Sequence, residues 1–451
     1  MAAITKDLTK GSVTKNLILF SIPMCLSYML QALYSSADAL IVGQFSALGD
    51  VTGVTQGGQI IHILTNGISG LSTGGAVLIS QYLGAKRDKE LKETIQSIFA
   101  LFAASAFALT VVMLLSNNLI IRLMQIPAEA VLPMKRYLQI CEIGLLFIFF
   151  YNCISAVLQA MGDSRHPLIF VGISCAVNVV LDLILVGAFQ MGAEGAAIAT
   201  VFSQLLSVIL SAVFLKKQQF TFDFKLSSYR FHRDKLGMLL KLGFPFVIMR
   251  TTVATSFVAV SGLANGFGLA ASSAAGIVNK INNFATMPFS AMQLAISSMA
   301  GQNIGAKNIK RAQHTLFAGF SINMIIGGCL LLAAQLWPDG MLRIFSSNEE
   351  LIETGRNFLR LFSLEYVLMP FSYSIHGLMT ASGHVWIPSL DGLLASVVFR
   401  VPLAALFASL MGFDGIALGG ALAVLGAAIP AVLFYCSGIW KKNAAQGKET
   451  A

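Results

Sequence analysis

Charged residues are scarce in this chain. Asp, Glu, Lys and Arg together make up 11% of its 451 residues, whereas soluble domains carry about 25%. Hydrophobic residues make up 56%. A water-facing surface of this size needs more charge than the chain offers, so the composition excludes a soluble globular protein. We expect lipid to surround most of the chain.

Several motifs are absent as well. No GxxxxGK[ST] loop occurs, which excludes a pump with its own P-loop ATPase. The six cysteines show no CxxC or Cys/His spacing, so a zinc site is not expected. No DDxxD or His-rich segment marks a membrane-embedded prenyl or acyl transferase. We therefore expect a protein that is not an enzyme and that needs no cofactor.

Twelve long apolar runs are present, and a helix crosses the bilayer core with roughly 20 such residues. The runs lack the alternation that is typical of strands. No A-x-A cleavage site closes the first run, so we expect it to remain as a spanning helix. The predicted fold class is all-α integral membrane, with twelve transmembrane helices at 15–43, 52–80, 92–115, 132–158, 166–187, 193–215, 236–263, 272–300, 312–336, 356–380, 386–410 and 415–438.

Basic residues lie mainly in every second gap between these runs. With both chain ends inside, the inner segments hold 20 of the 30 Lys and Arg residues, including Lys442 and Lys448, and the outer segments hold six. The positive-inside rule then predicts a multi-pass protein of the cell membrane with both termini in the cytoplasm. This topology, together with anionic membrane lipid, explains the net charge of +9, and nucleic acid is not an expected partner.

The chain contains an internal duplication, because several anchors recur 220 to 222 residues later. Each half has six helices, so both halves insert the same way up, as two lobes related by a pseudo-two-fold axis along the membrane normal. We expect an N-terminal lobe at 1–220, a cytoplasmic linker at 221–235 and a C-terminal lobe at 236–451. The paired anchors are Pro23 with Pro245, Gln81-Tyr-Leu-Gly-Ala-Lys86 with Gln302-Asn-Ile-Gly-Ala-Lys307, Gly162 with Gly383, and Gly192-Ala-Glu-Gly195 with Gly412-Phe-Asp-Gly415.

Two like lobes leave a cleft between them, and rocking the lobes opens that cleft to one side of the membrane and then to the other. The sequence therefore predicts a transporter. Without a P-loop, we expect an ion gradient to drive it. Acidic residues within the spans mark the expected pathway, because a carboxylate in hydrocarbon is costly. These acids are Asp38, Glu142, Asp182, Glu365 and Asp391.

Asp38 and Asp182 are predicted to lie at one depth. Each is about five residues below the outer end of its helix and Thr200 is about eight residues into the next helix, which places all three roughly 7–12 Å from the outer surface. Asn178 lies one turn deeper than Asp182 on the same helix face. Two carboxylates, an amide and a hydroxyl suit a sodium ion or a shared proton, and no other metal is expected. Alternatively, these groups only join helices.

Other charged residues in the spans admit more than one role. Glu142 and Glu365 would line the cleft or meet a basic partner such as Arg360. For Asp391 and Arg400, an inter-helix contact or an Asp–Arg structural pair is the favoured interpretation.

The second half has no acid at the positions that match Asp38 and Asp182, which lie near Val260 and Pro402. We therefore expect ion coupling in the N-terminal half alone. Arg250 and Lys280, in the seventh and eighth runs, would face the cleft or neutralise a buried acid.

Methionine and phenylalanine are plentiful, at 18 and 32 residues. Met side chains repack easily and aromatic faces attract cations, so such walls suit flat, apolar cations of varied shape. The predicted substrate-cavity residues are Gln31, Tyr34, Tyr151, Tyr373 and Met379.

Three stretches, in this order and spacing, resemble the multidrug and toxic compound extrusion (MATE) transporters of bacteria. The resemblance covers nearly the whole chain and includes the Gln-x-x-Gly-Ala-Lys element. The stretches are Gln31-Ala-Leu-Tyr34 with Ala37-Asp38 and Val42-Gly43, then Asn178-Val-Val-Leu-Asp182, then Gly192-Ala-Glu-Gly195-Ala-Ala-Ile-Ala-Thr200.

This resemblance implies secondary active efflux of cationic or lipophilic organic compounds by antiport with protons or sodium. It also implies that Asp38, Asn178, Asp182 and Thr200 form an N-lobe cation site. The chain lacks a clear match to the acid that some branches carry in the seventh or tenth helix, so a C-lobe cation site is not expected. We expect a monomer whose partners are small organic molecules and membrane lipid.

Two other functions compete with this one. A lipid-linked oligosaccharide flippase shares the fold, but such proteins often have fourteen helices and a basic cavity. An integral-membrane transferase would need the catalytic motifs that this chain lacks.

Overall fold

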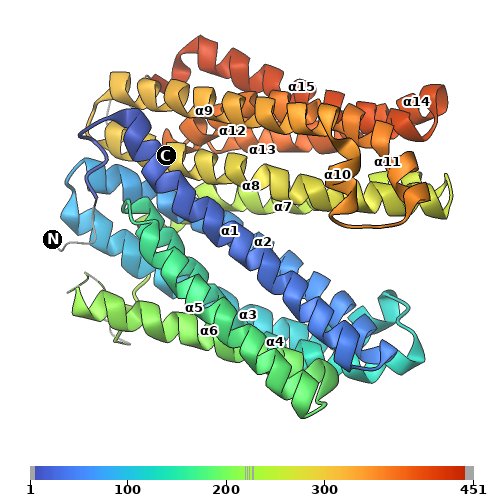
Figure 1. Cartoon of the computed structure of the whole chain (residues 1–451). Helices are drawn as coiled ribbons and strands as arrows, with labels where there is room; N and C mark the ends of the chain where they lie inside the picture. The colour runs from blue at the N-terminus through green and yellow to red at the C-terminus, as the bar shows by residue number, and fades with distance from the viewer. Residues whose placement is uncertain (1–5, 219, 221, 223, 226–227, 442–451) are drawn as a thin grey trace. The chain divides into compact units, whose positions relative to one another are not determined.

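The computed structural model describes residues 6–218, 220, 222, 224–225 and 228–441, which form helices and no strand (Figure 1). The predicted cytoplasmic residues Lys442 and Lys448 lie outside this part of the chain, as do the extreme ends whose location was predicted.

The first half contains six long helices, one for each of the first six apolar runs. They extend a few residues beyond the predicted bounds, because polar residues at both ends continue the helical turns. Their bounds are α1 (Val13–Phe45), α2 (Leu48–Gly84), α3 (Asp88–Leu123), α4 (Ala128–Ala160), α5 (Arg165–Asp182) with the π-helix η1 (Leu183–Ala188), and α6 (Gly192–Lys217).

The second half follows the same plan, except that one predicted helix is broken in two and a short extra helix is inserted before it. We predicted a single helix at 356–380, and this prediction is wrong, because one helix ends at Phe362 and the next begins at Glu365. Apolar residues on both sides of Ser363 hid this break from a hydropathy window. The elements are α7 (Arg233–Asn265), α8 (Leu269–Gly305), α9 (Ile309–Leu336), the unpredicted short α10 (Pro338–Arg343), α11 (Glu349–Phe362), α12 (Glu365–Ala381), α13 (Trp386–Leu393), the π-helix η3 (Leu394–Arg400), α14 (Val401–Met411) and α15 (Phe413–Ser437).

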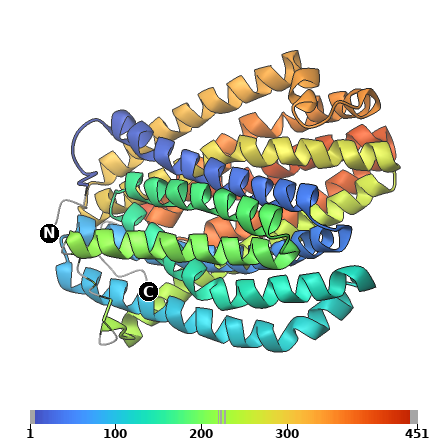
Figure 2. The same ribbon diagram turned by 60° about the horizontal axis from the view of Figure 1, so that its bottom comes forward.

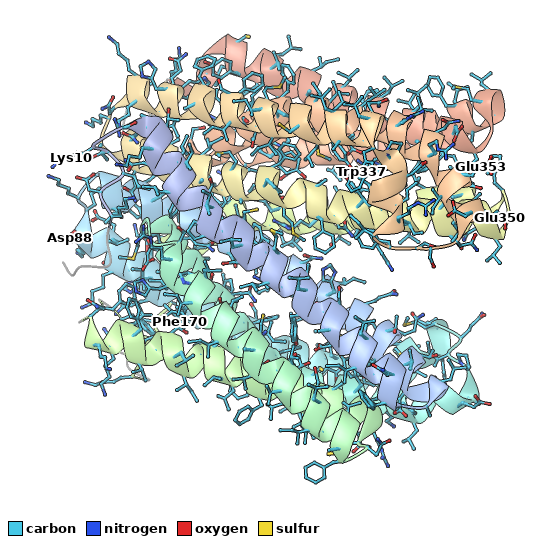
Figure 3. The ribbon with its side chains drawn as sticks, viewed as in Figure 1. Lys10, Asp88, Phe170, Trp337, Glu350 and Glu353 are labelled. Atoms are coloured by element: carbon cyan, nitrogen blue, oxygen red, sulfur yellow. The ribbon has the colours of Figure 1, made fainter. Side chains whose placement is uncertain are left out.

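Ten of the described helices are long and apolar enough to cross a membrane, when α5 is taken with η1 and α13 with η3 and α14. The two remaining predicted spans are α8 and the α11–α12 pair. Charged side chains mark the ends of these helices: Lys10 lies at one end of the C-terminal helices, and Glu350 and Glu353 lie at the other (Figure 3). The prediction of an all-α, multi-pass membrane protein is confirmed.

The described residues form two compact units. The N-terminal unit comprises residue 6, 26–79 and 87–241, and the C-terminal unit comprises 7–25, 80–86 and 242–441. In the N-terminal unit, α6 packs against α4 and α5, and α3 packs against α4 (Figure 2). In the C-terminal unit, α12 is central and packs against α8, α9 and α15.

Two short segments from the first half therefore group with the C-terminal unit. Leu8 is fully buried there, and its N–H donates to Gln302 Oε1 at 3.0 Å. At the end of α2, Gly84 lies so close to α8 that a Cβ on it would stand 1.9 Å from the Gln302 carbonyl oxygen. A Cβ on Gly305 would likewise stand 2.0 Å from the Gln81 carbonyl oxygen. The two copies of the Gln-x-x-Gly-Ala-Lys element thus cross each other through their glycines.

Candidate functional site

Three helices of the N-terminal unit bring the predicted cation-site residues together. Tyr34 and Asp38 lie one turn apart on α1, as do Asn178 and Asp182 on α5, and residues at this spacing share a helix face. The Tyr34 hydroxyl donates to Thr200 Oγ1 on α6 at 3.0 Å. The Asp38 carboxyl lies close to the Asp182 carboxyl and to the Tyr34 hydroxyl.

These side chains are largely removed from solvent. Asn178 and Asp182 are fully buried, and Thr200 is 8% exposed, whereas Asp38 is partly exposed. Asp182 is the last residue of α5 before the π-helix η1. Such wider turns occur often at functional sites, because they interrupt the regular hydrogen-bond ladder and redirect side chains.

The polar atoms of this cluster lack partners. Asp38 Oδ1, both carboxylate oxygens of Asp182 and both amide atoms of Asn178 are buried without a hydrogen bond. Buried polar groups are normally satisfied, since leaving one unpaired costs about 1–3 kcal/mol. Four oxygen atoms that need a positive partner fit a sodium ion, a hard cation with oxygen ligands, or a proton shared by the two carboxylates.

Two α4 residues also border this cluster, and we did not predict them. The Tyr137 hydroxyl lies near Tyr34 and Asp38, and it approaches the Cys141 thiol one turn along α4. Tyr137 is 7% exposed and Cys141 is fully buried. Both stand in an apolar helix whose acid Glu142 bonds Asn117 instead, so the sequence offered no signal that pointed to them. Among the described residues, no group of three or more His, Cys, Asp and Glu residues could hold a metal ion.

The predicted cavity residues of the first half lie in different surroundings. Gln31 is exposed on α1, and Tyr34 belongs to the cluster around Asp38. Tyr151 is 6% exposed, and its hydroxyl donates to the Pro167 carbonyl at 3.0 Å, which ties α4 to α5. Glu142 is fully buried and accepts a 2.9 Å hydrogen bond from Asn117 Nδ2.

In the C-terminal unit, the buried charged side chains form pairs that join two different helices. Glu365 on α12 meets Arg400 of η3 at 3.4 Å, so the suggested partner Arg360 is wrong; the backbone carbonyl of Arg360 accepts from Gln335 instead. Asp391 on α13 bonds His376 Nε2 on α12 at 2.9 Å. The inter-helix interpretation of Asp391 and Arg400 is therefore confirmed. An Asp391–Arg400 pair is wrong, because the two lie nine residues apart along one helical run and each meets a different residue of α12.

The remaining predicted residues of this unit are two cavity candidates and two cations. Tyr373 is partly exposed, with its ring centroid 6.0 Å from that of Phe289, and Met379 is fully buried. Arg250 and Lys280 are exposed. These four residues belong to the C-terminal unit, and the cluster around Asp38 belongs to the N-terminal unit.

Known proteins share both the sequence pattern and the fold. The MatE family model matches the chain twice, at residues 23–184 and 245–406, so its two matches start 222 residues apart, as the internal anchors do. "Probable multidrug resistance protein YpnP" of Bacillus subtilis is 29% identical over 440 residues, covering 96% of this chain and 97% of that protein. "Probable multidrug resistance protein NorM" of Thermotoga maritima is 24% identical over 444 residues, covering 97% and 95%.

Solved structures agree with this assignment at the level of the fold. A crystal structure of a MATE protein in its bent conformation has a TM-score of 0.89 at 21% identity, covering 97% of this chain and 98% of that one. An outward-facing multidrug resistance MATE family transporter has a TM-score of 0.88 at 21% identity, covering 98% of both chains. With the family model matched in both halves, the chain belongs to the MatE family of multidrug and toxic compound extrusion transporters.

Proposed function

We propose that this protein exports cationic or lipophilic organic compounds across the cell membrane by antiport with protons or sodium ions. One observation carries the proposal: Asp38 and Asp182 approach each other in the N-terminal unit, beside Asn178, with buried oxygens that lack partners. The names of the curated relatives support the cargo class, because those proteins are called multidrug resistance proteins.

The proposed cycle uses the cost of burying charge. Two adjacent carboxylates repel each other unless a cation lies between them or one of them is protonated. Cation uptake from outside therefore stabilises the cluster while the cargo leaves. The lobes then rock, the cation leaves to the cytoplasm, and new cargo enters. We place both termini in the cytoplasm, and we propose that a monomer in contact with membrane lipid is the working unit.

Asp38→Asn tests the proposal in proteoliposomes loaded with an ethidium-type dye. We expect the variant to lose gradient-driven dye transport, because an amide neither takes up a proton nor balances the charge of a cation. Asp182→Asn should behave in the same way. Imposing a pH gradient and a sodium gradient in separate experiments identifies the coupling ion.

Asp163→Asn is the matched control. Asp163 Oδ1 accepts hydrogen bonds from the backbone N–H groups of Arg165 and His166, and an asparagine oxygen keeps both. The contact of Oδ2 with His166 Nδ1 becomes one between neutral groups, inside the same turn of the chain. We expect this variant to transport dye at the wild-type rate. Wild-type transport by Asp38→Asn, with equal protein in the liposomes, would refute the role of the acid pair.

A further inference from the structure

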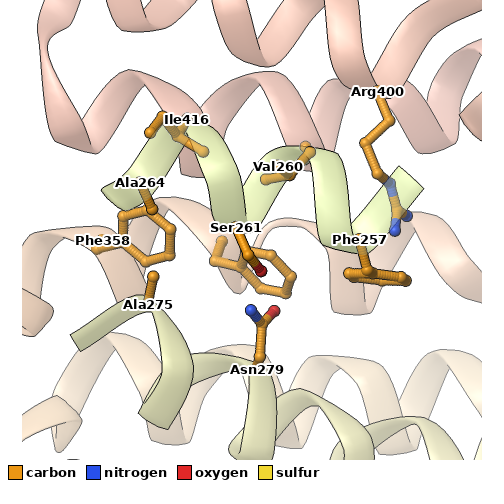
Figure 4. A pocket seen from close by; sticks show the side chains of 11 residues that line it. Phe257, Val260, Ser261, Ala264, Ala275, Asn279, Phe358, Arg400 and Ile416 are labelled. Atoms are coloured by element: carbon orange, nitrogen blue, oxygen red, sulfur yellow. The ribbon is translucent and has the colours of Figure 1, made fainter. Parts of the chain in front are cut away.

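A small cavity lies inside the C-terminal unit, lined by residues of α7, α8, α11, η3 and α15 (Figure 4). Its volume is about 20 Å³, enough for a group slightly larger than water, since one water needs at least roughly 10–15 Å³. The lining is mostly apolar, with Ser261 and Asn279 as neutral polar members and Arg400 as its charged member.

Arg400 is poorly satisfied for a buried cation. It is 8% exposed, and its Cζ lies 4.2 Å from the centroid of the Phe257 ring. Its bond to Glu365 Oε1 is long, at 3.4 Å, and uses Nη2 only. Nε and Nη1 are buried without a partner. A guanidinium carries five N–H donors, so this geometry requires an acceptor that the protein itself does not provide.

The internal duplication relates this cavity to the cation cluster of the N-terminal unit. At the repeat offset of 220 to 222 residues, Asn178 corresponds to a position within 398–400, which includes Arg400. Asp38 corresponds to Val260 at the offset of 222 between the two family matches. Val260 and Arg400 both line the cavity. In the second half, valine thus stands where the first half has the acid Asp38, and Arg400 lies at or within two residues of the counterpart of Asn178.

We propose that this cavity binds one small monovalent anion, such as chloride, with the Arg400 guanidinium as its main ligand. The two buried N–H groups of Arg400 that lack a partner favour a negative ion, whereas the buried oxygens around Asp38 favour a positive one. Thr200 of the cation cluster is also replaced, by Gly420 at the offset of 220, which removes another oxygen from the cavity wall. A chloride ion is only slightly larger than water, whereas a phosphate or a carboxylate-bearing drug exceeds the space available.

Charge balance links anion binding to Glu365. A chloride ion bound beside an ionised Glu365 would be repelled by its carboxylate, because little water is present to screen the two negative charges. Binding of the anion therefore favours the protonated form of Glu365. Chloride should therefore bind more tightly at acidic pH. Among the described residues, Glu365 is the charged or titratable side chain that pairs with Arg400. The others on the surrounding elements do not bond it; these are Arg233, Asp234, Lys235, Lys241, Arg250, Lys280, Glu349, Glu350, Glu353, Arg356, Arg360, Tyr366, Tyr373, His376, Asp391, Asp414, Tyr435 and Cys436.

Equilibrium dialysis of the full chain in nanodiscs against radiolabelled chloride tests the proposal, with sodium gluconate holding the ionic strength constant. We expect about one chloride per chain in the wild type and at least tenfold weaker binding in Arg400→Gln. Arg122→Gln, which removes an exposed arginine from the end of α3, is the matched control and should bind as the wild type does. Absence of chloride binding by the wild type, or equal binding by Arg400→Gln, overturns the proposal.

Two further variants keep the test decisive if Arg400→Gln does not fold. Val260→Asp places a carboxylate in the cavity wall and should weaken chloride binding at least tenfold, because that carboxylate pairs with Arg400. Glu365→Gln should retain chloride binding and lose its pH dependence. Unchanged binding in Val260→Asp contradicts the location, and a pH dependence that persists in Glu365→Gln contradicts the linkage to that acid.

Discussion

Tyr34 connects the acidic residue of α1 to α6. Its hydroxyl donates to Thr200 Oγ1 at 3.0 Å and lies close to the Asp38 carboxyl. Tyr34, which we predicted to line the substrate cavity, thus belongs to the cation cluster. Its hydroxyl therefore holds Thr200 in position beside the two carboxyl groups.

Tyr34→Phe should weaken cation-driven efflux without abolishing it. A lost neutral hydrogen bond is worth about 0.5–1.5 kcal/mol, so we expect a two- to roughly tenfold lower transport rate. Initial rates of dye transport in proteoliposomes provide the measurement. Tyr435→Phe is the control, because it removes a hydroxyl that accepts from Gln313 in the C-terminal unit. Equal losses in the two variants would show that Tyr34 has no special role.

His376 is the partner of a buried acid. Its Nε2 lies 2.9 Å from Asp391 Oδ2, and Asp391 is fully buried with its other oxygen unpaired. His376→Ala should lower the unfolding free energy by about 1–3 kcal/mol, because it leaves this carboxyl without its partner. Thermal unfolding in detergent measures the effect. The double variant with Asp391→Asn should lose less stability than the sum of the two single variants, and strict additivity would rule out a direct pair.

At the scale of elements, the ends of α2 and α8 cross through Gly84 and Gly305. Each glycine would place a Cβ about 2 Å from a backbone carbonyl oxygen of the other segment, and backbone cannot move aside as a long side chain does. The paired Gln-x-x-Gly-Ala-Lys elements therefore serve a close helix contact, in the way small residues do in membrane proteins generally.

Gly305→Ala should force this crossing apart and destabilise the protein by about 1–3 kcal/mol, the usual cost of overpacking. Gly276→Ala is the matched control on the same helix, because a Cβ there would meet nothing within 4 Å. We expect that control to be neutral or slightly stabilising, since alanine favours helices over glycine. The midpoint of thermal unfolding distinguishes the two, and a neutral Gly305→Ala would contradict the close crossing.

At the scale of the whole molecule, the basic loops predict the orientation in the membrane. With the six native cysteines replaced, Arg122→Cys and Arg343→Cys should react with an impermeant maleimide applied outside intact cells. Lys89→Cys and Lys310→Cys should react only after the cells are opened. All four positions are exposed, so a difference in labelling reports the side of the membrane. The reverse pattern would place both termini outside.

Much of this architecture was predictable from short stretches of the chain. All twelve apolar runs became helical, the run at 356–380 as parts of two helices, because spanning length and apolarity are local properties. The break beside Ser363 was missed, since apolar residues flank it on both sides. Asp38 and Asp182 were expected together from their depth alone, whereas the pairing of Glu365 with Arg400 was not expected. That pairing depends on how two helices are rotated about their axes.

The composition of the sequence determined that the protein lies in a membrane. The lengths of the apolar runs determined the number of spans, and the duplication determined that there are two related halves. They did so because transfer into lipid depends on side-chain chemistry summed along a segment. Only the tertiary structure decided which buried polar atoms meet, and it placed Arg400 in the wall of a small cavity in the C-terminal unit. Hydrogen bonds act over about 3 Å, so helix rotation and crossing, which the packing of many side chains sets together, decide every such pair.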